Sequence, residues 1–576
     1  MTTYGNPDFA SVKVIPLTDF GDAEHLQANA GTIMRLALEA AGAHAGPVVL
    51  EVPYGTYHFY PEHADKAAYS ITNTASEEEN PDVTRTIALL MKGQRRLTLE
   101  GNGSLFVIHG KQTMLLLDNC EDIEIRNLRF DYARPTVTEM TVERIGEKEL
   151  DVQVHPDSQY KLEDGRLTWV GEGWTFRGGP VQHCDIDANR TWRVDDWPSR
   201  AKRIEETGSR RLRFHFGDNA IPDVRPGITV QMRDGIRDQV GVLIAGCRRV
   251  RLTELGIHFM HGLGVVGQFS EDLTFSSLEL APRRETGRTV AGFADFIHLS
   301  GCRGLVSITD SKFAGAHDDA INVHGTYLRM VDQPAPNQVK VRFMHPQTYG
   351  FQAYFPGDEV AFVSADSLAS YAAGRIAAVE SLNPREFLLT LEQPAPTLLG
   401  EQDVLENLTW TPEIVIERNH FARIPTRGIL VTSPRKTTIR DNRFESIHMS
   451  GILVSADANS WYESGAVTDL LITGNVFDLS GGAEFPILRI APENEHSTGE
   501  MPVHRNIRIE DNRFKVSQAP LLSARSTEGL VFRRNDILLE QMGQESTAEP
   551  DAGGLVRFEN CSGVEMADNR FRYQKQ

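Results

Sequence analysis

The segment TTIRDNRF, residues 437–444, is one copy of a pattern that recurs along the chain. Each copy begins with the apolar–polar alternation typical of a strand and ends in a large apolar residue. In the six closest copies an asparagine lies two positions before that residue, and uninterrupted copies recur at intervals of 21 to 37 residues. The other close copies are IVIERNHF (414–421), LLITGNVF (470–477), IRIEDNRF (507–514), LVFRRNDI (530–537) and VEMADNRF (564–571); divergent copies are IEIRNLRF (123–130), LTELGIHF (252–259), LTFSSLEL (273–280) and VSITDSKF (306–313).

This repeat predicts an all-β solenoid, namely a right-handed parallel β-helix. A period of roughly 20 to 50 residues is typical of solenoids. No helical pattern fits between copies, and the signature of leucine-rich repeats is absent, so each coil should consist of strands and bends. Because asparagine tolerates the left-handed backbone conformation, we expect the repeated asparagines at tight bends. Four aromatic residues should stack inside the solenoid: Phe421, Phe444, Phe477 and Phe514.

A second strand follows many copies of the repeat, for example GILVTS (428–433), GILVSA (451–456) and AINVHG (320–325). The cysteines also follow the coil, because four of the five fall at nearly the same place in it, which predicts a ladder of small buried thiols. Their odd number and the absence of C-x-x-C spacing indicate neither a disulfide framework nor a zinc site. The four are Cys120, Cys247, Cys302 and Cys561.

The N-terminal region predicts a helix that covers the open end of the solenoid. Within residues 29–59 an amphipathic pattern places Ile33, Leu36, Ala37 and Ala40 on one face, and a strand follows. Such a helix would protect the first strand edge from pairing with other chains.

Two stretches interrupt the repeat and carry short strands with turn signals, so we expect two small β-barrel insertions. Both leave the solenoid just after a coil strand, and both are therefore expected to overhang one face. The predicted domains are a capping helix with the first coils (1–133), insertion 1 (134–236), central coils with the candidate site (237–325), insertion 2 (326–410) and C-terminal coils (411–576).

The composition of the chain excludes some classes of function. The chain has 576 residues and a formal net charge of −20, which argues against nucleic acid as a partner. No apolar run approaches the ~20 residues of a membrane span. The start shows no leader, so we expect a cytoplasmic protein, or a secreted, periplasmic or cell-surface bacterial protein if a leader was removed.

The candidate site lies in AGAHDDAINVHG, residues 314–325, where two acids are adjacent. Aligning the apolar positions of ADFIHLSGC (294–302), this segment and TRGILVTS (426–433) places Asp295, Asp319 and Arg427 in one column, with Asp318 beside them. Since stacked strands lie ~4.8 Å apart, the three carboxylates should form one patch and raise each other's pKa.

Several neighbours in these coils offer directional hydrogen bonds to sugar hydroxyl groups. His298, Asn322, His324 and Arg427 are the candidates for substrate binding, and Trp461 is a candidate for stacking on a sugar face. Arg283, Arg284 and Arg288 fit a solvated loop better than a pocket.

Other interpretations of the acidic patch remain at this stage. It fits a solvated turn, a calcium site built from hard oxygen ligands, or an acid and a base ~6.5–9.5 Å apart as in an inverting glycosidase. A non-catalytic glycan-binding β-helix and a polysaccharide lyase also fit the architecture.

The arrangement Asp295 … Asp318–Asp319 on successive coils resembles the inverting polygalacturonases, but their Gly-His-Gly and Arg-x-Lys motifs have no counterpart. The chain more closely resembles glycoside hydrolase family 110 over most of its length. That resemblance implies an exo-acting, inverting α-1,3-galactosidase without metal or other cofactor, acting on blood group B-type or linear α-galactosyl glycans. It implies Asp318 as general acid, with Asp295 and Asp319 activating the water. The expected partners are this glycan and, as an option, a second copy of the chain.

Overall fold

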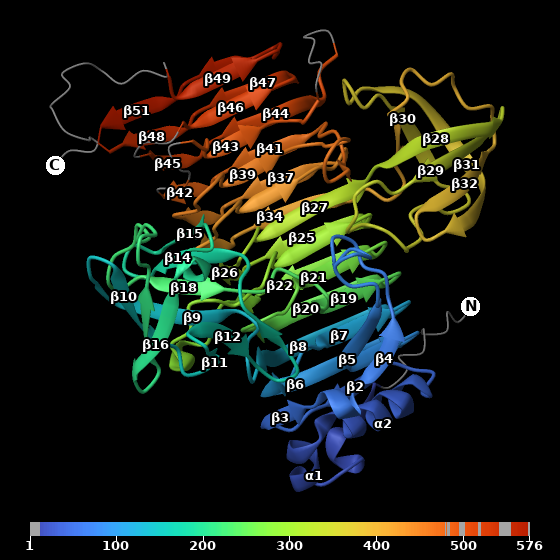
Figure 1. Cartoon of the computed structure of the whole chain (residues 1–576). Helices are drawn as coiled ribbons and strands as arrows, with labels where there is room; N and C mark the ends of the chain where they lie inside the picture. Colours follow the sequence, from blue (N-terminus) through green and yellow to red (C-terminus); the bar gives the residue numbers. More distant parts are fainter. Residues whose placement is uncertain are drawn as a thin grey trace, which may run out of the picture.

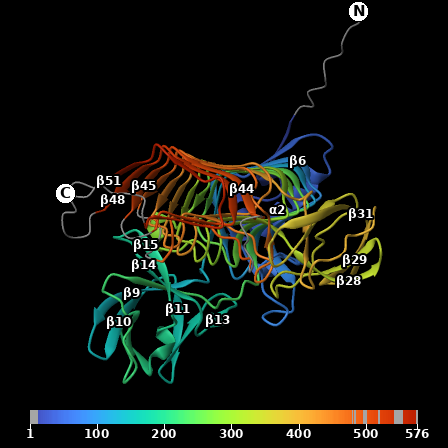
Figure 2. The same cartoon turned by 90° about the horizontal axis from the view of Figure 1, so that it is seen from above.

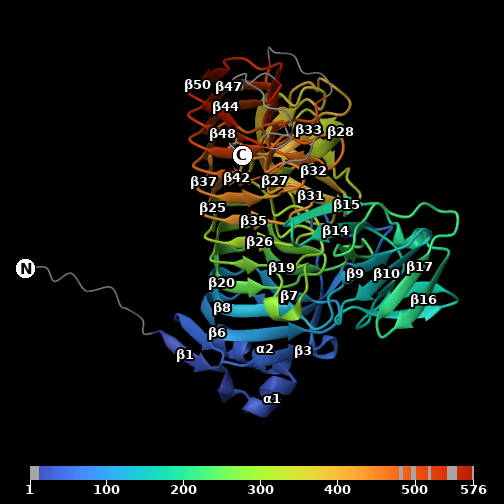
Figure 3. The same ribbon diagram turned by 90° about the vertical axis from the view of Figure 1, so that its left-hand side faces the viewer.

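The computed structural model describes residues 12–478, 480, 484–494, 501–516, 520–540 and 554–573, and it is a parallel β-helix, as predicted (Figure 1). Figure 3 shows the coils stacked from the helical cap to the C-terminal strands. No helix in these ranges is long and apolar enough to cross a membrane. Two parallel sheets run along the solenoid; we call the one that carries the candidate site sheet B and the other sheet A.

Sheet B receives one strand from each coil. Its parallel strands are β5 (Thr84–Lys92), β7 (Thr113–Asp118), β19 (Val240–Ala245), β21 (Leu263–Gln268), β24 (Ile297–Ser300), β27 (Ile321–Thr326), β36 (Ile429–Val431), β39 (Ile452–Val454), β43 (Leu488–Ile490), β46 (Leu522–Arg525) and β49 (Val556–Glu559). At its edges β4 (Asp65–Ala68) pairs antiparallel with β5, and β40 (Glu463–Ser464) pairs antiparallel with β27.

Sheet A carries the repeat quoted above, split by a bend into two short strands in most coils. Its strands are β1 (Lys13–Pro16), β2 (Val48–Glu51), β3 (Thr56–Phe59), β6 (Arg95–Ile108), β8 (Glu121–Tyr132), β20 (Arg248–Ile257), β22 (Glu271–Ser276), β23 (Glu279–Leu280), β25 (Arg303–Thr309), β26 (Lys312–Ala314), β34 (Glu413–Glu417), β35 (His420–Ala422), β37 (Thr437–Arg440), β38 (Arg443–Glu445), β41 (Leu470–Thr473), β42 (Val476–Asp478), β44 (His504–Glu510), β45 (Arg513–Val516), β47 (Thr527–Arg533), β48 (Asp536–Leu539), β50 (Glu565–Ala567) and β51 (Arg570–Tyr573).

The repeated asparagines do not adopt the left-handed conformation that we expected of them. The left-handed residue is the preceding one, for example Asp441 before Asn442. The asparagines instead form an internal amide ladder: the backbone N–H and side-chain Nδ2 of Asn419 both donate to Oδ1 of Asn442, at 2.9 and 3.1 Å. Burial explains this role, because a buried bend needs its backbone polar groups paired. The ladder contains Asn419, Asn442, Asn475, Asn512, Asn535 and Asn569.

The predicted phenylalanine stack is confirmed. The ring centroids of Phe421 and Phe444 lie 4.8 Å apart, and those of Phe444 and Phe477 lie 4.6 Å apart with nearly parallel planes. Phe514 continues the stack at 4.9 Å, and the four rings are almost completely buried. This stack and the aliphatic residues of both sheets form one continuous core.

The thiol ladder is partly interrupted. Cys120 donates its backbone N–H to the sulfur of Cys247 at 3.3 Å, but Ser270 takes the next position before Cys302. All five cysteines are free, and Cys561 is only half-buried.

Helix α2 (Ala30–Gly42) and the short α1 (Ala23–Ala28) cover the first coil. The expected face of α2 was partly wrong, because Leu36 is 46% exposed while Met34 and Leu38 are buried. With 3.6 residues per turn, a face centred between Ile33 and Met34 leaves Leu36 on the opposite side.

Insertion 1 lies between β8 and β19, and insertion 2 lies between β27 and β34, so they flank sheet B at opposite ends of its strands (Figure 2). In insertion 1 a seven-stranded and a three-stranded sheet surround one core. The strand order of the larger sheet is β15-β14-β18-β9-β10-β17-β16, which leaves two edges. The strands of insertion 1 are β9 (Thr138–Ile145), β10 (Glu149–Val154), β11 (Gln159–Glu163), β12 (Arg166–Val170), β13 (Thr175–Phe176), β14 (Val181–Asp185), β15 (Arg190–Val194), β16 (Arg203–Gly208), β17 (Arg211–His215) and β18 (Thr229–Met232).

Insertion 2 is a closed barrel of order β28-β29-β32-β31-β30-β33. Its strands are β28 (Leu328–Ala335), β29 (Gln338–Arg342), β30 (Glu359–Val363), β31 (Ser370–Asn383), β32 (Glu386–Leu391) and β33 (Val404–Asn407).

Candidate active site

The register of sheet B places the predicted acids together. Ile297 pairs with Ile321, and Ile321 pairs with Ile429. Two residues earlier in each coil, Asp295 and Asp319 therefore stand in one column, and the backbone N–H of Asp319 donates to Oδ1 of Asp295 at 3.2 Å. The preceding coil, that of β21, has apolar Leu263 at this position. The acidic patch thus begins at Asp295.

Asp319 is held by three donors from the next coil. Its Oδ1 accepts the hydroxyl of Thr426 at 2.6 Å and the backbone N–H of Arg427 at 3.0 Å, while Oδ2 lies 2.7 Å from Nη2 of Arg427. The carboxylate is only 2% exposed. Arg427 therefore brings a fixed positive charge to the column in which sequence register placed it.

Asp318 lies beside this column, with one carboxylate oxygen within 4.8 Å of an oxygen of each of the other two acids, and it is the most exposed of the three, at 22% of its side chain. Its Oδ2 lies 2.9 Å from Nη2 of Arg193, a residue of β15 in insertion 1. Burial alone would raise the pKa of Asp318, but the charges of Arg193, Arg427 and Arg237 hold that pKa below its usual range. In the free protein Asp318 is thus a carboxylate.

The two acids in the column are shifted in the other direction. Burial, reinforced by the charge of Asp318, raises the pKa of Asp295 to about 7. Burial also raises the pKa of Asp319 to about 7, against the attraction of Arg427. Groups this close titrate together, so the column as a whole takes up a proton near neutral pH.

Two predicted histidines form a buried file behind Asp295. Nδ1 of His298 lies 2.8 Å from Oδ2 of Asp295, and Nε2 of His298 lies 2.9 Å from Nε2 of His324. Burial lowers the pKa of His298 to about 4, although Glu463 opposes this shift. His298 lines the pocket, but His324 does not, so its predicted direct contact with a substrate has no support in the geometry.

Glu463 was not predicted, although it is a central acid of the site. It lies on β40, which pairs antiparallel with β27 and so escapes the repeat pattern. Its carboxylate accepts Nδ2 of Asn73 at 3.0 Å and Nδ2 of Asn322 at 3.4 Å. The only available signal was its position two residues after Trp461.

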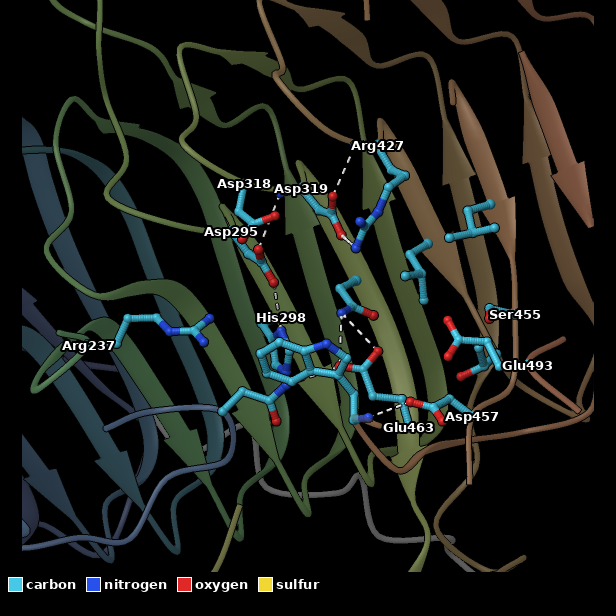
Figure 4. Close-up of a pocket in the computed structure, with 16 residues that line it drawn as sticks. Arg237, Asp295, His298, Asp318, Asp319, Arg427, Ser455, Asp457, Glu463 and Glu493 are labelled. Atoms are coloured by element: carbon cyan, nitrogen blue, oxygen red, sulfur yellow. Dashed lines mark hydrogen bonds and ion pairs between the residues drawn. The ribbon is translucent and has the colours of Figure 1, made fainter. Parts of the chain in front are cut away.

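These residues surround one pocket of about 170 Å³ on the outer face of sheet B (Figure 4). That volume has room for on the order of ten water-sized groups, close to a single sugar ring. The lining residues are Asn73, Arg237, Asp295, His298, Asp318, Asp319, Asn322, Arg427, Leu430, Thr432, Leu453, Ser455, Asp457, Trp461, Glu463 and Glu493.

Trp461 forms part of the wall, as the sequence suggested. It is 39% exposed and stacks on His345 of insertion 2, with ring centroids 4.2 Å apart. Asp457 accepts the backbone N–H of Ser460 at 2.8 Å and that of Trp461, which fixes the loop. Both insertions therefore support the pocket, one through Arg193 and the other through His345.

Two of the arginines that the sequence assigned to a solvated loop have a structural role away from the pocket. Arg283 lies 2.7 Å from Asp131, and Arg288 is buried against the same carboxylate. The expectation of a solvated loop was thus wrong for Arg288, because Asp131 is buried and needs a counter-charge.

A second pocket of about 280 Å³ adjoins the first and shares Arg237, Asp318 and Trp461 with it. Its remaining walls come largely from insertion 1, including Gln182 and Arg193. Asp318 therefore stands at the junction of two pockets.

Within the part of the chain that the structure describes, two groups of side chains are close enough to hold a cation: the three aspartates, and His298 with His324 and Glu463. In both groups, other partners already occupy the polar atoms. Asp318 and Asp319 accept from Arg193, Arg427 and Thr426, Asp295 lies 2.8 Å from Nδ1 of His298, and the histidine nitrogens are at hydrogen-bond distance from each other. The arrangement of close, paired carboxylates and imidazoles suits proton transfer.

Comparisons with known proteins identify similar sequences. A family described as GLAA-B beta-barrel domain II matches residues 338–405, within insertion 2. "Alpha-1,3-galactosidase A" of Bacteroides thetaiotaomicron is 39% identical over 540 residues, which cover 93% of this chain and 93% of the relative. "Alpha-1,3-galactosidase B" of the same organism is 33% identical, covering 97% and 91%. Among solved structures, the Streptococcus pneumoniae surface adhesin PfbA covers 97% of this chain and 90% of its own, with 11% identity and a TM-score of 0.38.

Proposed function

Since the chain belongs to glycoside hydrolase family 110, the α-1,3-galactosidases, we propose that it is an exo-acting, inverting enzyme that releases terminal α-1,3-linked galactose. The proposed substrates carry this galactose in blood group B-type or linear α-galactosyl glycans. The observation that carries the proposal is the pocket itself, which holds three carboxylates on adjacent coils and has room for about one sugar ring.

The position of Asp318 supports its assignment as general acid. The acid must reach the glycosidic oxygen, which lies between the galactose and the leaving sugar. Asp318 borders both the sugar-sized pocket and the adjoining one, so galactose in the first pocket would place its leaving group in the second.

The column of Asp295 and Asp319 supports their assignment to the water. The backbone N–H of Asp319 donates to the carboxylate of Asp295, and oxygens of the two acids lie within 4.8 Å of each other, so one water can contact both carboxylates. A base is most effective when its pKa lies near the working pH, and both pKa values are raised to about 7.

The ion pair between Arg193 and Asp318 must weaken before the acid acts, because it keeps Asp318 ionised. Arg193 is 45% exposed and also lines the adjoining pocket. A leaving sugar in that pocket would compete for the guanidinium, and loss of this contact would raise the pKa of Asp318.

The product anomer tests the inverting mechanism. One oxygen from each aspartate lies within 4.8 Å of the others, which is shorter than the ~6.5–9.5 Å typical of inverting pairs and close to the ~5–5.5 Å of retaining pairs. Proton NMR of the first turnovers on a terminal α-1,3-galactoside should show β-galactose. Early α-galactose would mean retention, and no free galactose at all would overturn the proposed activity.

A further inference from the structure

A continuous hydrogen-bonded file of side chains runs from the site along the outer face of sheet B, opposite the core residues Ile297 and Val323. Oδ2 of Asp295 lies 2.8 Å from Nδ1 of His298, and Nε2 of His298 lies 2.9 Å from Nε2 of His324. The file ends where Nδ1 of His324 lies 2.6 Å from the carbonyl oxygen of Gly325. Both rings are only 1% exposed, so no solvent water competes for their nitrogens.

The carbonyl at the end of the file determines where its protons lie. A carbonyl oxygen only accepts, so Nδ1 of His324 carries a proton and Nε2 of the neutral ring is an acceptor. Nε2 of His298 must then donate to it, because two unprotonated nitrogens at 2.9 Å would repel each other. A neutral His298 has one ring proton, which leaves its Nδ1 unprotonated and facing Asp295.

We infer that His298 is the proton-accepting partner of Asp295 in the water-activating step, and that His324 and Gly325 set its tautomer. This inference rests on the proposed hydrolase function. With Asp295 ionised, the contact between Asp295 and His298 is the one place in the file that lacks a proton, and the repulsion between the carboxylate oxygen and the ring nitrogen makes the pair a stronger base. A proton taken from water fills that place and completes the file.

The step balances without any further reactant. One O–H bond of the water breaks as its oxygen bonds to the anomeric carbon, and the glycosidic C–O bond breaks as its oxygen takes the proton of Asp318. The water's proton comes to rest between Oδ2 of Asp295 and Nδ1 of His298. These two atoms are 2.8 Å apart, so they can share the proton without any rearrangement.

The surrounding charges leave His298 neutral before the step. Burial lowers its pKa to about 4 against the raising effect of Glu463, and burial also lowers the pKa of His324. Glu463 lies 3.5 Å from Nε2 of His324 and so compensates positive charge that arrives on the file. The charged groups facing the two rings are Asp295, Asp318, Asp319, Glu463 and Arg237.

Nitrogen NMR on the intact, substrate-free protein tests the tautomers. Protein labelled with ring-¹⁵N histidine is examined in chelator above pH 8, and the two residues are assigned with His298→Gln and His324→Gln. We expect His298 protonated at Nε2 and His324 protonated at Nδ1. A His298 protonated at Nδ1 would overturn the inference. Because no substrate is present, this result does not depend on the proposed activity.

Kinetics test the consequence for the base. In His324→Phe, His298 loses its acceptor and can turn its proton toward Asp295, so the pKa of the base falls. We expect kcat to drop about 10²-fold, the lower end of general-base help, with little change in KM and with the acidic limb of the pH profile moved to lower pH. His258→Gln, a buried histidine outside the pocket, is the control. An unmoved acidic limb in His324→Phe would reduce the file to a structural role.

Discussion

Arg427 lies one coil after Asp319 in the same column, and its Nη2 is 2.7 Å from Oδ2 of that aspartate. The charge of this guanidinium also acts to lower the pKa values of Asp318 and Asp295, so one cation stabilises the ionised form of all three carboxylates. The relationship follows from the register of a parallel sheet, in which adjacent coils present matched positions. It makes Arg427 the first residue to test.

Replacing Arg427 with Met should reduce both stability and activity. Removing one partner of a buried ion pair typically costs about 3–5 kcal/mol, and partial exposure of Arg427 should place this variant near or below the lower value. Thermal unfolding and kcat/KM measure the two effects. Arg435→Met, which changes an exposed arginine outside the pocket, is the control. Wild-type activity in Arg427→Met would remove this cation from the site.

Asp318→Asn should lose far more activity on a natural disaccharide than on an activated aryl galactoside. An aryl leaving group needs little protonation, whereas acid help for a sugar is worth about 10²–10⁴-fold. Asp295→Asn and Asp319→Asn should lose similar factors on both substrates. Each variant is compared at its own pH optimum, because loss of one charge shifts the remaining pKa values. Leaving-group dependence in Asp319→Asn instead would reverse the assigned roles.

Activity should rise with pH toward neutrality. The proposed base must be ionised, and the pKa values of Asp295 and Asp319 are raised to about 7. We therefore expect kcat, which reports the substrate complex in which Asp318 carries its proton, to increase about tenfold per pH unit below that value, for one proton lost. A profile that is flat from pH 5 to 8 would contradict this assignment.

Stability should show the opposite trend, and Asp295→Asn should reveal it. Asp295 has a pKa of about 7 in the folded protein, against ~3.9 in the unfolded chain, so the folded state binds more protons between these values. The free energy of unfolding should therefore fall as the pH rises from about 4 to 7. An asparagine at this position mimics the protonated acid. Its melting temperature should therefore exceed that of the wild type at pH 8 but not at pH 4. A lower melting temperature at pH 8 would contradict the sign.

Arg193→Gln tests the role of insertion 1. Without the guanidinium, the pKa of Asp318 should rise, so the proposed acid should stay protonated to higher pH. The basic limb of kcat, which reports the substrate complex, should therefore move to higher pH on a disaccharide. Arg166→Gln changes an exposed arginine of the same insertion that lines neither of the two pockets bordered by Asp318, and it should leave this limb unchanged. An unmoved basic limb in Arg193→Gln would exclude this influence on the acid.

The sequence predicted what the stacking of coils dictates. Because parallel strands pair in register, aligning apolar residues was enough to place Asp295 above Asp319 and to bring Arg427 into the same column. Glu463 and Arg193 were not predictable in this way. One lies on an antiparallel edge strand and the other on an inserted sheet, and the path of such segments depends on long-range packing that no local pattern records.

The role of the repeated asparagines was also predicted wrongly from the sequence. Asparagine is common both at left-handed bends and in buried amide stacks, and a repeat alone does not separate the two. The structure assigns the strained backbone to the preceding residue, such as Asp441, and the buried hydrogen bonds to Asn442.

The same ladder restricts how a chain of this kind can change its length during evolution. An extra residue between Asn442 and Phe444 would turn the next side chain outward and break the amide contacts on both sides. Tolerated additions must therefore be whole coils, which extend the ladder by one asparagine, or excursions that leave and re-enter at a corner. Insertions 1 and 2 are of the second kind, and for that reason new surfaces can be added beside the column of Asp295 and Asp319 without disturbing its register.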